Sequence, residues 1–394
     1  MAIAPVRPRP GPRTIDQFQA FQNDLDAVLQ RELRSLGAGD ARYVLGLLWL
    51  ARALEVLGRG LLAVGGAMVW TWVPGVVLLT VAHLIETMEL GHNLMHGQFN
   101  WMNDPRVSAR GYRWTFACAP EDWREFHNLH HHHWANVPGR DRDYGTLRLW
   151  RAQPWGWAFV WQGLWSTIAA LAFEWSVAIH NLQLERRRTD PEGARARIRR
   201  LWPRVRARMG LTARREYLWW PLVGAVLAMG WAAVHDRALV DAGLGGYTAV
   251  ALGNLAAATV RNVWAYLVIA VGHFTTEAYT FVEQDLEGES RGQWYLRQAL
   301  SAANFHSNRV LDVLSGNASH QIEHHLFPDL PSNRLARIAP EVRAILQRHG
   351  VPYHTGALSR QVGAVLWRIT RHSFPGGWAH LTRLREGDDA ANAR

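Results

Sequence analysis

Long blocks of apolar residues alternate with polar segments along this chain. Four stretches contain no Asp, Glu, Lys or Arg: 60–85, 152–173, 217–235 and 242–260, and apolar sequence continues after the last one to Val271. Several of them reach the roughly 20 apolar residues that a helix needs to cross a bilayer. Tryptophans lie near their ends, where amphipathic rings favour the headgroup region: Trp70, Trp72, Trp155, Trp157, Trp219 and Trp220. The pattern favours membrane-spanning helices over the buried helices of a large soluble domain.

The two ends of the chain have a different pattern. Residues 1–13 are rich in Pro and Arg with no apolar run behind them, so we expect a flexible cytoplasmic leader and not a signal peptide. Apolar residues then recur at helical spacing over 15–36, which predicts an amphipathic helix. These features predict a leader with an amphipathic helix in 1–40, a membrane domain in 41–375 and a polar tail in 376–394.

Composition changes this picture in two ways. The mean hydropathy of −0.15 would suit a soluble enzyme, but it averages the apolar blocks with strongly polar segments. The formal net charge is +10, and residues 185–215 hold twelve arginines. By the positive-inside rule we expect this segment to be a cytoplasmic loop at the lipid surface. No nucleic-acid recognition motif accompanies it, so we expect no nucleic-acid partner. Cys118 is the single cysteine, which excludes an intramolecular disulfide and a thiolate metal site.

The candidate chemistry lies in the 19 histidines. Most of those between 83 and 325 fall in three groups, at 92–96, 127–133 and 320–325. His92 and His96 are four residues apart, which on a helix places both rings on one face, and the same spacing recurs in the other two groups. A pair with an adjacent third histidine, repeated, suits two closely spaced metal ions. Imidazoles without thiolates favour Fe, Zn, Cu or Ni, and a zinc hydrolase needs only about three ligands. The excess of histidine therefore favours a binuclear redox metal.

With these groups in view, the chain resembles the membrane fatty acid desaturases, whose mark is three boxes of the form H-x-x-x-H, H-x-x-x-H-H and H/Q-x-x-H-H. The phrases at 91–98, 101–105, 292–298 and 321–328 are similar to the actinobacterial acyl-CoA desaturases of the stearoyl-CoA type. The resemblance covers most of the chain, from about residue 40 to 370. It implies a non-haem di-iron centre at the cytoplasmic face of the membrane, with O₂ as co-substrate.

Residue by residue, the resemblance implies eight ligands and adds a ninth histidine ahead of the third box: His92, His96, His127, His131, His132, His320, His324 and His325, with His273 as the addition. The run from His130 to His133 leaves the register of the second box open. Candidates for groups that hold the imidazoles in place are Glu89, Asp104, Asp143, Asn317, Glu323 and His130. For each of these carboxylates, a role as an ordinary surface or helix-capping group explains the sequence about as well as a role in holding an imidazole.

The position of the boxes predicts the topology. All three must lie on one side of the membrane, so the chain crosses an even number of times between 97 and 320. The segments 217–235 and 242–271 supply two crossings, and 43–64 with 69–90 supply the pair ahead of the first box. Residues 152–180 are interrupted by Glu174 and are expected to lie in the interface. We therefore expect an all-α integral membrane protein with four transmembrane helices and a cytoplasmic helical cap that holds the metal site.

The expected activity is oxygen-dependent insertion of a cis double bond into a long-chain fatty acyl substrate, carried as acyl-CoA or on another carrier. The acyl chain requires a narrow apolar tunnel. Without a complete G-x-G-x-x-G motif we expect no flavin or nicotinamide on this chain, and a separate ferredoxin- or flavin-type NAD(P)H reductase as electron donor. Exposed arginines in 185–215 and 334–348 suit an acidic partner, a CoA phosphate or the lipid surface. The alternatives are a di-iron membrane hydroxylase and a His-rich membrane metal-binding or transport protein.

Overall fold

The computed structural model describes residues 13–65, 68–143, 147–149, 153–187 and 190–375, and this part of the chain is mostly helical. Strand structure within these ranges is confined to β1 (Asn304–Phe305) and β2 (Thr355–Gly356), which pair in parallel with Asn304 opposite Thr355. The predicted leader lies largely in residues 1–12, and the predicted tail in 376–394, both outside the described residues.

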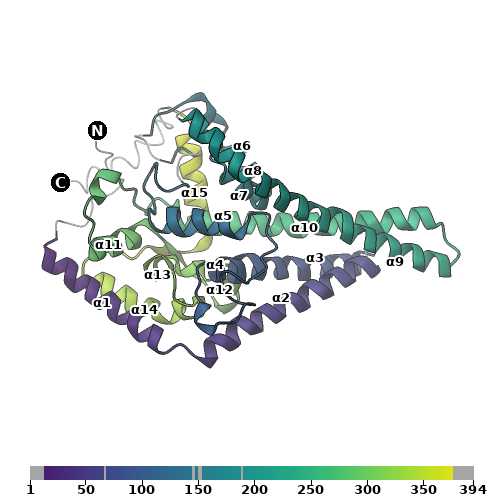
Figure 1. Ribbon diagram of the computed structural model, residues 1–394, viewed down its shortest axis with the longest axis horizontal. Coiled ribbons are helices and arrows are strands. Elements are labelled where there is room, and N and C mark those ends of the chain that lie inside the picture. The colour runs from purple at the N-terminus through teal and green to yellow at the C-terminus, as the bar shows by residue number, and fades with distance from the viewer. Residues whose placement is uncertain (1–12, 66–67, 144–146, 150–152, 188–189, 376–394) are drawn as a thin grey trace.

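Four long helices form two hairpins that extend together away from the rest of the chain (Figure 1). They are α2 (Ala38–Gly65) with α3 (Val69–Leu84), and α9 (Trp220–Val234) with α10 (Leu239–His273). The hairpins pack side by side, because α10 contacts α3 and α2 contacts α9. Three helical stretches are long and apolar enough to cross a membrane: Val69–Met95, Pro191–Val234 and Leu239–His273. They contain three of the four predicted spans, and the crossing by 43–64, within α2, stays a prediction.

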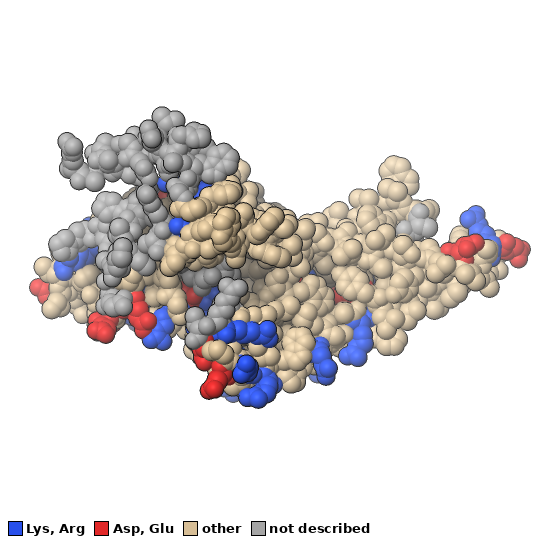
Figure 2. Space-filling view, turned by 90° about the horizontal axis from the view of Figure 1, so that it is seen from above, with Lys and Arg blue, Asp and Glu red and all other residues tan. Residues whose placement is uncertain are grey.

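The outer surface of the hairpins is apolar. Large hydrophobic side chains are exposed on all four helices, among them Val56, Trp70, Val226, Trp231 and Leu244. In the view of Figure 2, the visible face of this extension has few charged side chains apart from some arginines. Charged side chains also lie at its far tip. Soluble monomers rarely expose apolar area on this scale, whereas a lipid-facing helix must do so.

Glycines allow the backbones of α9 and α10 to approach closely. A Cβ atom added at Gly246 would lie 2.5 Å from the carbonyl oxygen of Gly224, whereas one added at Gly245 would meet nothing within 4 Å. Small residues of this kind are typical of helix contacts in membranes.

We therefore expect Gly246→Val to destabilise the hairpin by about 1–3 kcal/mol, because the backbones must separate to admit the side chain. Gly245→Val is the matched control, since it adds the same side chain one residue earlier. Thermal unfolding of both purified variants tests this, and equal midpoints would contradict the contact.

The remaining helices surround the base of the hairpins. They are α1 (Ile15–Arg34), α4 (Asn93–Met95), α5 (Pro120–Arg124), α6 (Gln162–Leu171), α7 (Phe173–His180), α8 (Pro191–Arg214), α11 (Arg291–Ser301), α12 (Arg309–Leu314), α13 (Gln321–Leu326), α14 (Leu335–Arg348) and α15 (Leu358–His372), with short 3-10 helices at Asn100–Met102, Trp157–Trp161, Leu184–Arg187, Glu283–Leu286, Ala318–His320 and Ser332–Arg334. Helix α1 confirms the predicted amphipathic helix. Helices α6 and α7 are too short to cross a bilayer, as expected for a segment lying in the interface.

The arginine-rich segment differs from its prediction. We expected a loop at 185–215, but α8 begins at Pro191 and continues through the π-helix η6 (Arg215–Trp219) into α9. Asp190 caps the helix by accepting a hydrogen bond from the Gly193 amide at 2.9 Å, and proline occupies the first helical position. Both are helix-start signals, and the prediction of a loop rested on charge alone.

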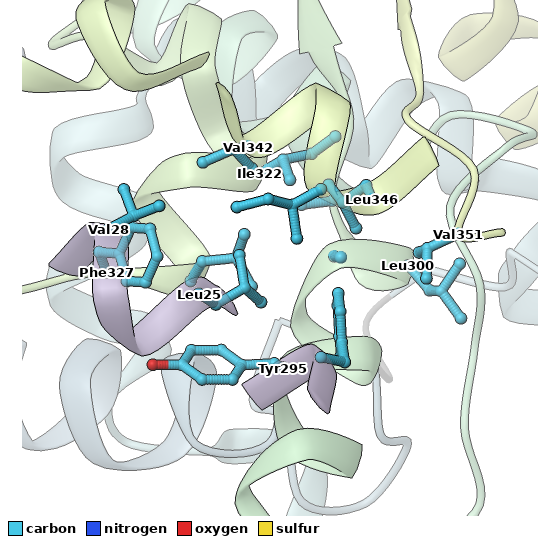
Figure 3. Close-up of a cluster of buried hydrophobic side chains, with 14 of the residues drawn as sticks. Leu25, Val28, Tyr295, Leu300, Ile322, Phe327, Val342, Leu346 and Val351 are labelled. Atoms are coloured by element: carbon cyan, nitrogen blue, oxygen red, sulfur yellow. The ribbon is translucent and has the colours of Figure 1, made fainter. Parts of the chain in front are cut away.

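A buried core fixes the third histidine box. Side chains from α1, α11, α13 and α14 pack together, and Ile322 and Leu326 of the box itself are fully buried among them. Figure 3 shows Ile322 beside Val342 and Leu346 of α14. Because two box residues are core residues, the imidazoles on the other face of α13 have a fixed orientation.

Buried ion pairs join the two hairpins to each other and to α7. The Arg59 guanidinium of α2 donates to both carboxylate oxygens of Glu216 in η6, at 3.0 and 2.9 Å, and also contacts Asn254 of α10. Arg261 of α10 pairs with Glu174 of α7. These four charged residues include several that bounded the apolar blocks in the sequence, and burial is tolerated because each charge is paired.

Candidate metal centre

The three histidine boxes meet at the base of the hairpins. Helix α3 continues as the π-helix η1 (Ile85–His92) and α4, which carry the first box, and the second box lies in the π-helix η3 (Glu125–His132). His273 is the last residue of α10. Since α3 and α10 both run from the far tip to the base, the first box and His273 lie at the same end of the molecule (Figure 1).

Five histidines form the first group. The ligand atoms of His92, His96, His127, His132 and His324 all lie within 4.8 Å of one another. Their Nε2 atoms face each other: His127 is 3.1 Å from both His92 and His132, and His92 is 3.2 Å from His96. Nε2 of His324 is buried and has no hydrogen-bond partner among the described residues.

A second group lies against the first. His131, His132 and His325 also have ligand atoms within 4.8 Å of one another, so His132 belongs to both groups. Nε2 of His273 is 3.2 Å from Nε2 of His131 and 3.0 Å from Nε2 of His325. The structure therefore brings together eight of the nine histidines that the sequence singled out.

The π-helices explain how neighbouring histidines reach one point. A π-helix has a wider turn than an α-helix, and π-turns occur frequently at functional sites. In η3 this wide turn brings together His127 and His132, five residues apart, whereas we expected an α-helix and the pair four apart. The stretch from Ile85 to His92 is likewise a π-helix.

The protonation of these imidazoles suits metal binding. Burial lowers the pKa of His127, His132, His324 and His325 well below its ordinary value, and neighbouring imidazoles lower it further. Neutral imidazole is the form that binds metal ions. Several neutral Nε2 atoms face one another, with few hydrogen-bond donors between them. Such a group of ligand atoms fits two closely spaced metal ions of the kind that imidazole prefers.

Two aspartates orient His131. Its Nδ1 is 3.3 Å from both carboxylate oxygens of Asp141 and 3.2 Å from Asp143. Burial opposes a charge on His131, but the two carboxylates outweigh it and raise its pKa to about 9. A carboxylate behind a ligating histidine fixes the ring and increases its basicity. We named Asp143 and missed Asp141, although the pattern Asp-x-Asp that begins nine residues after His132 was a usable signal.

An amide supports the third box. The side-chain oxygen of Gln298, in α11, is 2.9 Å from Nδ1 of His325, and its amide nitrogen donates to the backbone carbonyl of His132 at 2.8 Å. Gln298 thus joins two boxes that are far apart in sequence. It lies in the phrase at 292–298 that carried part of the family resemblance, but we did not name it as a site residue.

Three of the predicted supporting residues lie in other networks. Glu89 accepts hydrogen bonds from Asn317 at 2.9 Å, from Tyr43 at 2.8 Å and from Ser332 at 2.5 Å. Glu323 accepts from Asn304 and Tyr353, and burial raises its pKa to about 7. Both networks anchor the helices that carry the boxes, and within the described residues neither carboxylate hydrogen-bonds an imidazole of the two groups.

Three other predicted residues lie elsewhere. Asp104 pairs with the exposed Arg106 at 2.6 Å. His130 contacts Arg142 at 2.5 Å. His320 lies 3.7 Å from Asp312, outside the two groups. It precedes α13 with ψ 52°, so His320 and His324 do not share a helix face as the spacing suggested. Its role as a ligand stays a prediction.

An apolar cavity of about 480 Å³ opens onto the histidines. His92, His127, His131 and His273 form part of its wall, and aromatic side chains form much of the rest, among them Trp114, Phe116, Trp123, Phe173 and Tyr266. Its volume and its mostly apolar lining are those of a site for a small apolar ligand. Since the imidazoles border the cavity, a ligand inside it would lie against the metal centre.

Comparison with known proteins agrees with this geometry. The family described as fatty acid desaturase matches residues 69–357. The chain is 39% identical over 377 residues to the NADPH-dependent stearoyl-CoA 9-desaturase of Mycobacterium tuberculosis, covering 94% of this chain and 82% of that protein. Shorter matches include the acyl-lipid 8-desaturase of Rebecca salina, 45% identical over 60 residues, or 15% of this chain and 14% of that protein. Cattle fatty acid desaturase 3 is 33% identical over 72 residues, or 18% and 16%.

The match over 94% of the chain includes all three histidine boxes, the cavity wall and both hairpins. Together with the convergence of eight histidines beside an apolar cavity, it shows that this chain belongs to the fatty acid desaturase family.

Proposed function

We propose that this protein inserts a cis double bond into a long-chain fatty acyl-CoA, with O₂ as co-substrate and reduction of O₂ to water. The observation that carries the proposal is the apolar cavity whose wall includes four of the clustered histidines. The relative that matches 94% of the chain is named for stearoyl-CoA, which supports CoA as the carrier.

Two non-haem iron ions, when bound by these histidines, would activate the O₂ that oxidises the acyl chain, a reaction that no side chain carries out. Their proposed ligands are His92, His96, His127, His131, His132, His273, His324 and His325, with His320 as a further candidate. The chain's own part is to hold the rings and to position the substrate. Asp141, Asp143 and Gln298 fix the imidazoles, and the aromatic wall excludes water and keeps one segment of the acyl chain against the centre.

The membrane arrangement follows from the hairpins. We infer that α2, α3, α9 and α10 cross the bilayer and that the described elements at their base form a cytoplasmic cap, within a membrane domain at 41–375. Helices α3 and α10 both run toward the base, where the boxes lie, which supports boxes on one side of the bilayer. This arrangement also argues against a metal transporter, whose ligands would be spread along a path through the membrane.

Electrons must come from a partner, for which we propose a separate ferredoxin- or flavin-type NAD(P)H reductase. A surface groove of about 710 Å³ reaches His96, and Arg110 and Arg124 line it. A positive groove beside a candidate ligand suits the approach of an acidic electron donor.

Expression of the full chain in a host that supplies a reductase tests the function. We expect a new monounsaturated fatty acid, two mass units lighter than its precursor, and no such product from His324→Ala, because this change removes a donor from the first group. Products heavier by one oxygen would instead identify a hydroxylase. The iron content of the purified wild-type chain is measured alongside. If that chain contains iron and the fatty acid profile of the host still does not change, the proposal is contradicted.

A further inference from the structure

A small polar cavity lies beside the apolar one. It measures about 10 Å³, close to the smallest space that holds one water molecule. Residues of α3, η1, α7, α8, η6 and α10 line it, and its histidine and charged members are His83, Glu86, Glu174, Arg215, Glu216 and Arg261. None of these residues belongs to the two histidine groups of the metal centre. The polar cavity is therefore a separate site between the hairpins and α7.

His83, in the last turn of α3, has no protein partner in this cavity. The residue is 8% exposed, and neither of its ring nitrogens makes a hydrogen bond within the described part of the chain. A neutral imidazole has one donor and one acceptor, and leaving them unused in a buried position costs free energy unless water satisfies them. The size of the cavity and the unused nitrogens of His83 together fit one bound water molecule.

Glu86 is the carboxylate of the cavity that is best placed to take up and release a proton. It pairs at 3.0 Å with Arg52, which is 34% exposed, and it accepts a hydrogen bond from the Thr115 hydroxyl at 3.3 Å. The other two carboxylates, Glu174 and Glu216, each pair with an arginine that is almost fully buried. Such a pair keeps a carboxylate charged, because arginine does not release its proton.

The polar cavity reaches the surface on the side of α8. Arg215, the first residue of η6, lines the cavity, and its side chain is 32% exposed. Helix α8 leads into η6 and belongs to the base of the molecule, which we infer to be cytoplasmic. Protons from that side therefore have a short path to His83 and Glu86.

A thin wall separates the polar cavity from the apolar cavity at the metal centre. Thr115 lines the polar cavity while its two neighbours in sequence line the apolar one, and Glu174 and Phe173 are divided in the same way. Thr87 of η1 is buried and lines both cavities. At Thr87 the wall is therefore a single side chain.

The backbone of η1 relates Thr87 to the metal centre. Thr87 and His92 are five residues apart in this π-helix, and both line the apolar cavity. The same spacing brings His127 and His132 together in η3. A hydroxyl accepts one hydrogen bond while it donates another, so Thr87 can pass a proton from one cavity to the other.

We propose that the polar cavity supplies protons to the metal centre, through a water molecule bound by His83, the carboxylate of Glu86 and the hydroxyl of Thr87. The inference rests on the proposed function, because insertion of the double bond consumes protons: –CH₂–CH₂– + O₂ + 2 e⁻ + 2 H⁺ gives –CH=CH– + 2 H₂O. The electrons come from the proposed reductase. Since the acyl chain fills the apolar cavity during the reaction, the protons need a separate route.

A crystal structure of the full chain, at a resolution that shows ordered water, tests the site without turnover. We expect a water molecule within hydrogen-bond distance of a ring nitrogen of His83 in the wild type. We expect none in His83→Phe, whose ring occupies the same space without binding water. A lipid chain, a metal ion or a protein side chain against these nitrogens in the wild type would overturn the proposal.

Thr87→Val tests the route during turnover, because it keeps the shape of the side chain and removes the hydroxyl. We expect kcat for stearoyl-CoA to fall about tenfold or more, since positioned proton-transfer groups contribute at least this much. KM should stay the same, and the ratio of kcat in H₂O to kcat in D₂O should rise, because proton transfer then limits the rate. Thr80→Val is the matched control: the Thr80 hydroxyl donates to the carbonyl of Val76 in the same helix and lines neither cavity.

Glu86→Gln should lower kcat and raise the isotope ratio in the same way, because an amide does not exchange a proton at this step. Its control is Glu55→Gln. Glu55 also pairs with Arg52, at 3.3 Å, but does not line the polar cavity. Both control variants should keep the kcat and the isotope ratio of the wild type. Iron content and elution volume show which variants have folded, and only those are compared.

Two results during turnover would overturn the proposal. One is a wild-type kcat and isotope ratio in both Thr87→Val and Glu86→Gln. The other is a lower kcat with an unchanged isotope ratio, which would assign these side chains a purely structural role. Either result leaves the desaturase function standing, whereas absence of an unsaturated product from the wild-type chain would refute that function even if water is bound at His83.

Discussion

His132→Ala is expected to lose most of its bound iron and to retain less than about one hundredth of wild-type desaturation, because loss of a ligand should exceed the 10–100-fold effect of losing an outer partner. His132 is the one histidine that belongs to both groups, with its Nε2 3.1 Å from that of His127 and its ring stacked on His325 at 4.3 Å. Its removal therefore opens both halves of the centre. Iron measured per chain and the yield of unsaturated fatty acid check the expectation.

The adjacent His133 supplies the control. Its side chain is exposed, its ring contacts Trp134, and it belongs to neither group. His133→Ala should keep the iron content and the activity of the wild type. If both variants lost iron equally, the register of the second box described here would be wrong.

Asp141→Asn is expected to lower iron affinity and desaturation by about 10–100-fold while the fold is retained. The carboxylate accepts from the backbone amides of Asn136 at 2.8 Å and Asp143 at 3.0 Å, and faces Nδ1 of His131. An amide of the same shape retains one acceptor but presents a donor where the other carboxylate oxygen was. His131 would then lose the partner that fixes its ring and strengthens it as a donor to metal.

Asp104→Asn tests the alternative that any carboxylate near the boxes has this effect. Asp104 is a residue that the sequence suggested, and its partner is the exposed Arg106. Iron titration of the two variants side by side separates them: we expect no change for Asp104→Asn. An equal loss in both, or in neither, would contradict the role of Asp141.

The expected boundaries of the hairpins agree well with the structure because they depend on local composition. At 217–235 and 242–260 a run without Asp, Glu, Lys or Arg is long enough for a lipid-facing helix. Such a run does not decide this alone, because 152–173 forms only a 3-10 helix and the short helix α6. The loop expected at 185–215 was wrong for a related reason: Asp190 and Pro191 are local helix signals that an argument from charge did not use.

The sequence by itself determined the family, the histidines of the candidate metal centre and the apolar hairpins. These follow from residue types at short spacings: His92 and His96, four residues apart, lie in one group as expected, although the π-helix of the second box pairs His127 with His132 and not with His131.

Only the tertiary structure decided which groups support the metal centre. Gln298 of α11 contacts His325 of α13, and Asp141, not Asp104, contacts His131. His130 contacts Arg142, and His320 precedes α13 with a non-helical backbone conformation. The physical reason is the same in each case. Hydrogen bonds to a buried imidazole depend on which segments pack together and on local backbone angles such as those of a π-helix, and spacing along the chain specifies neither.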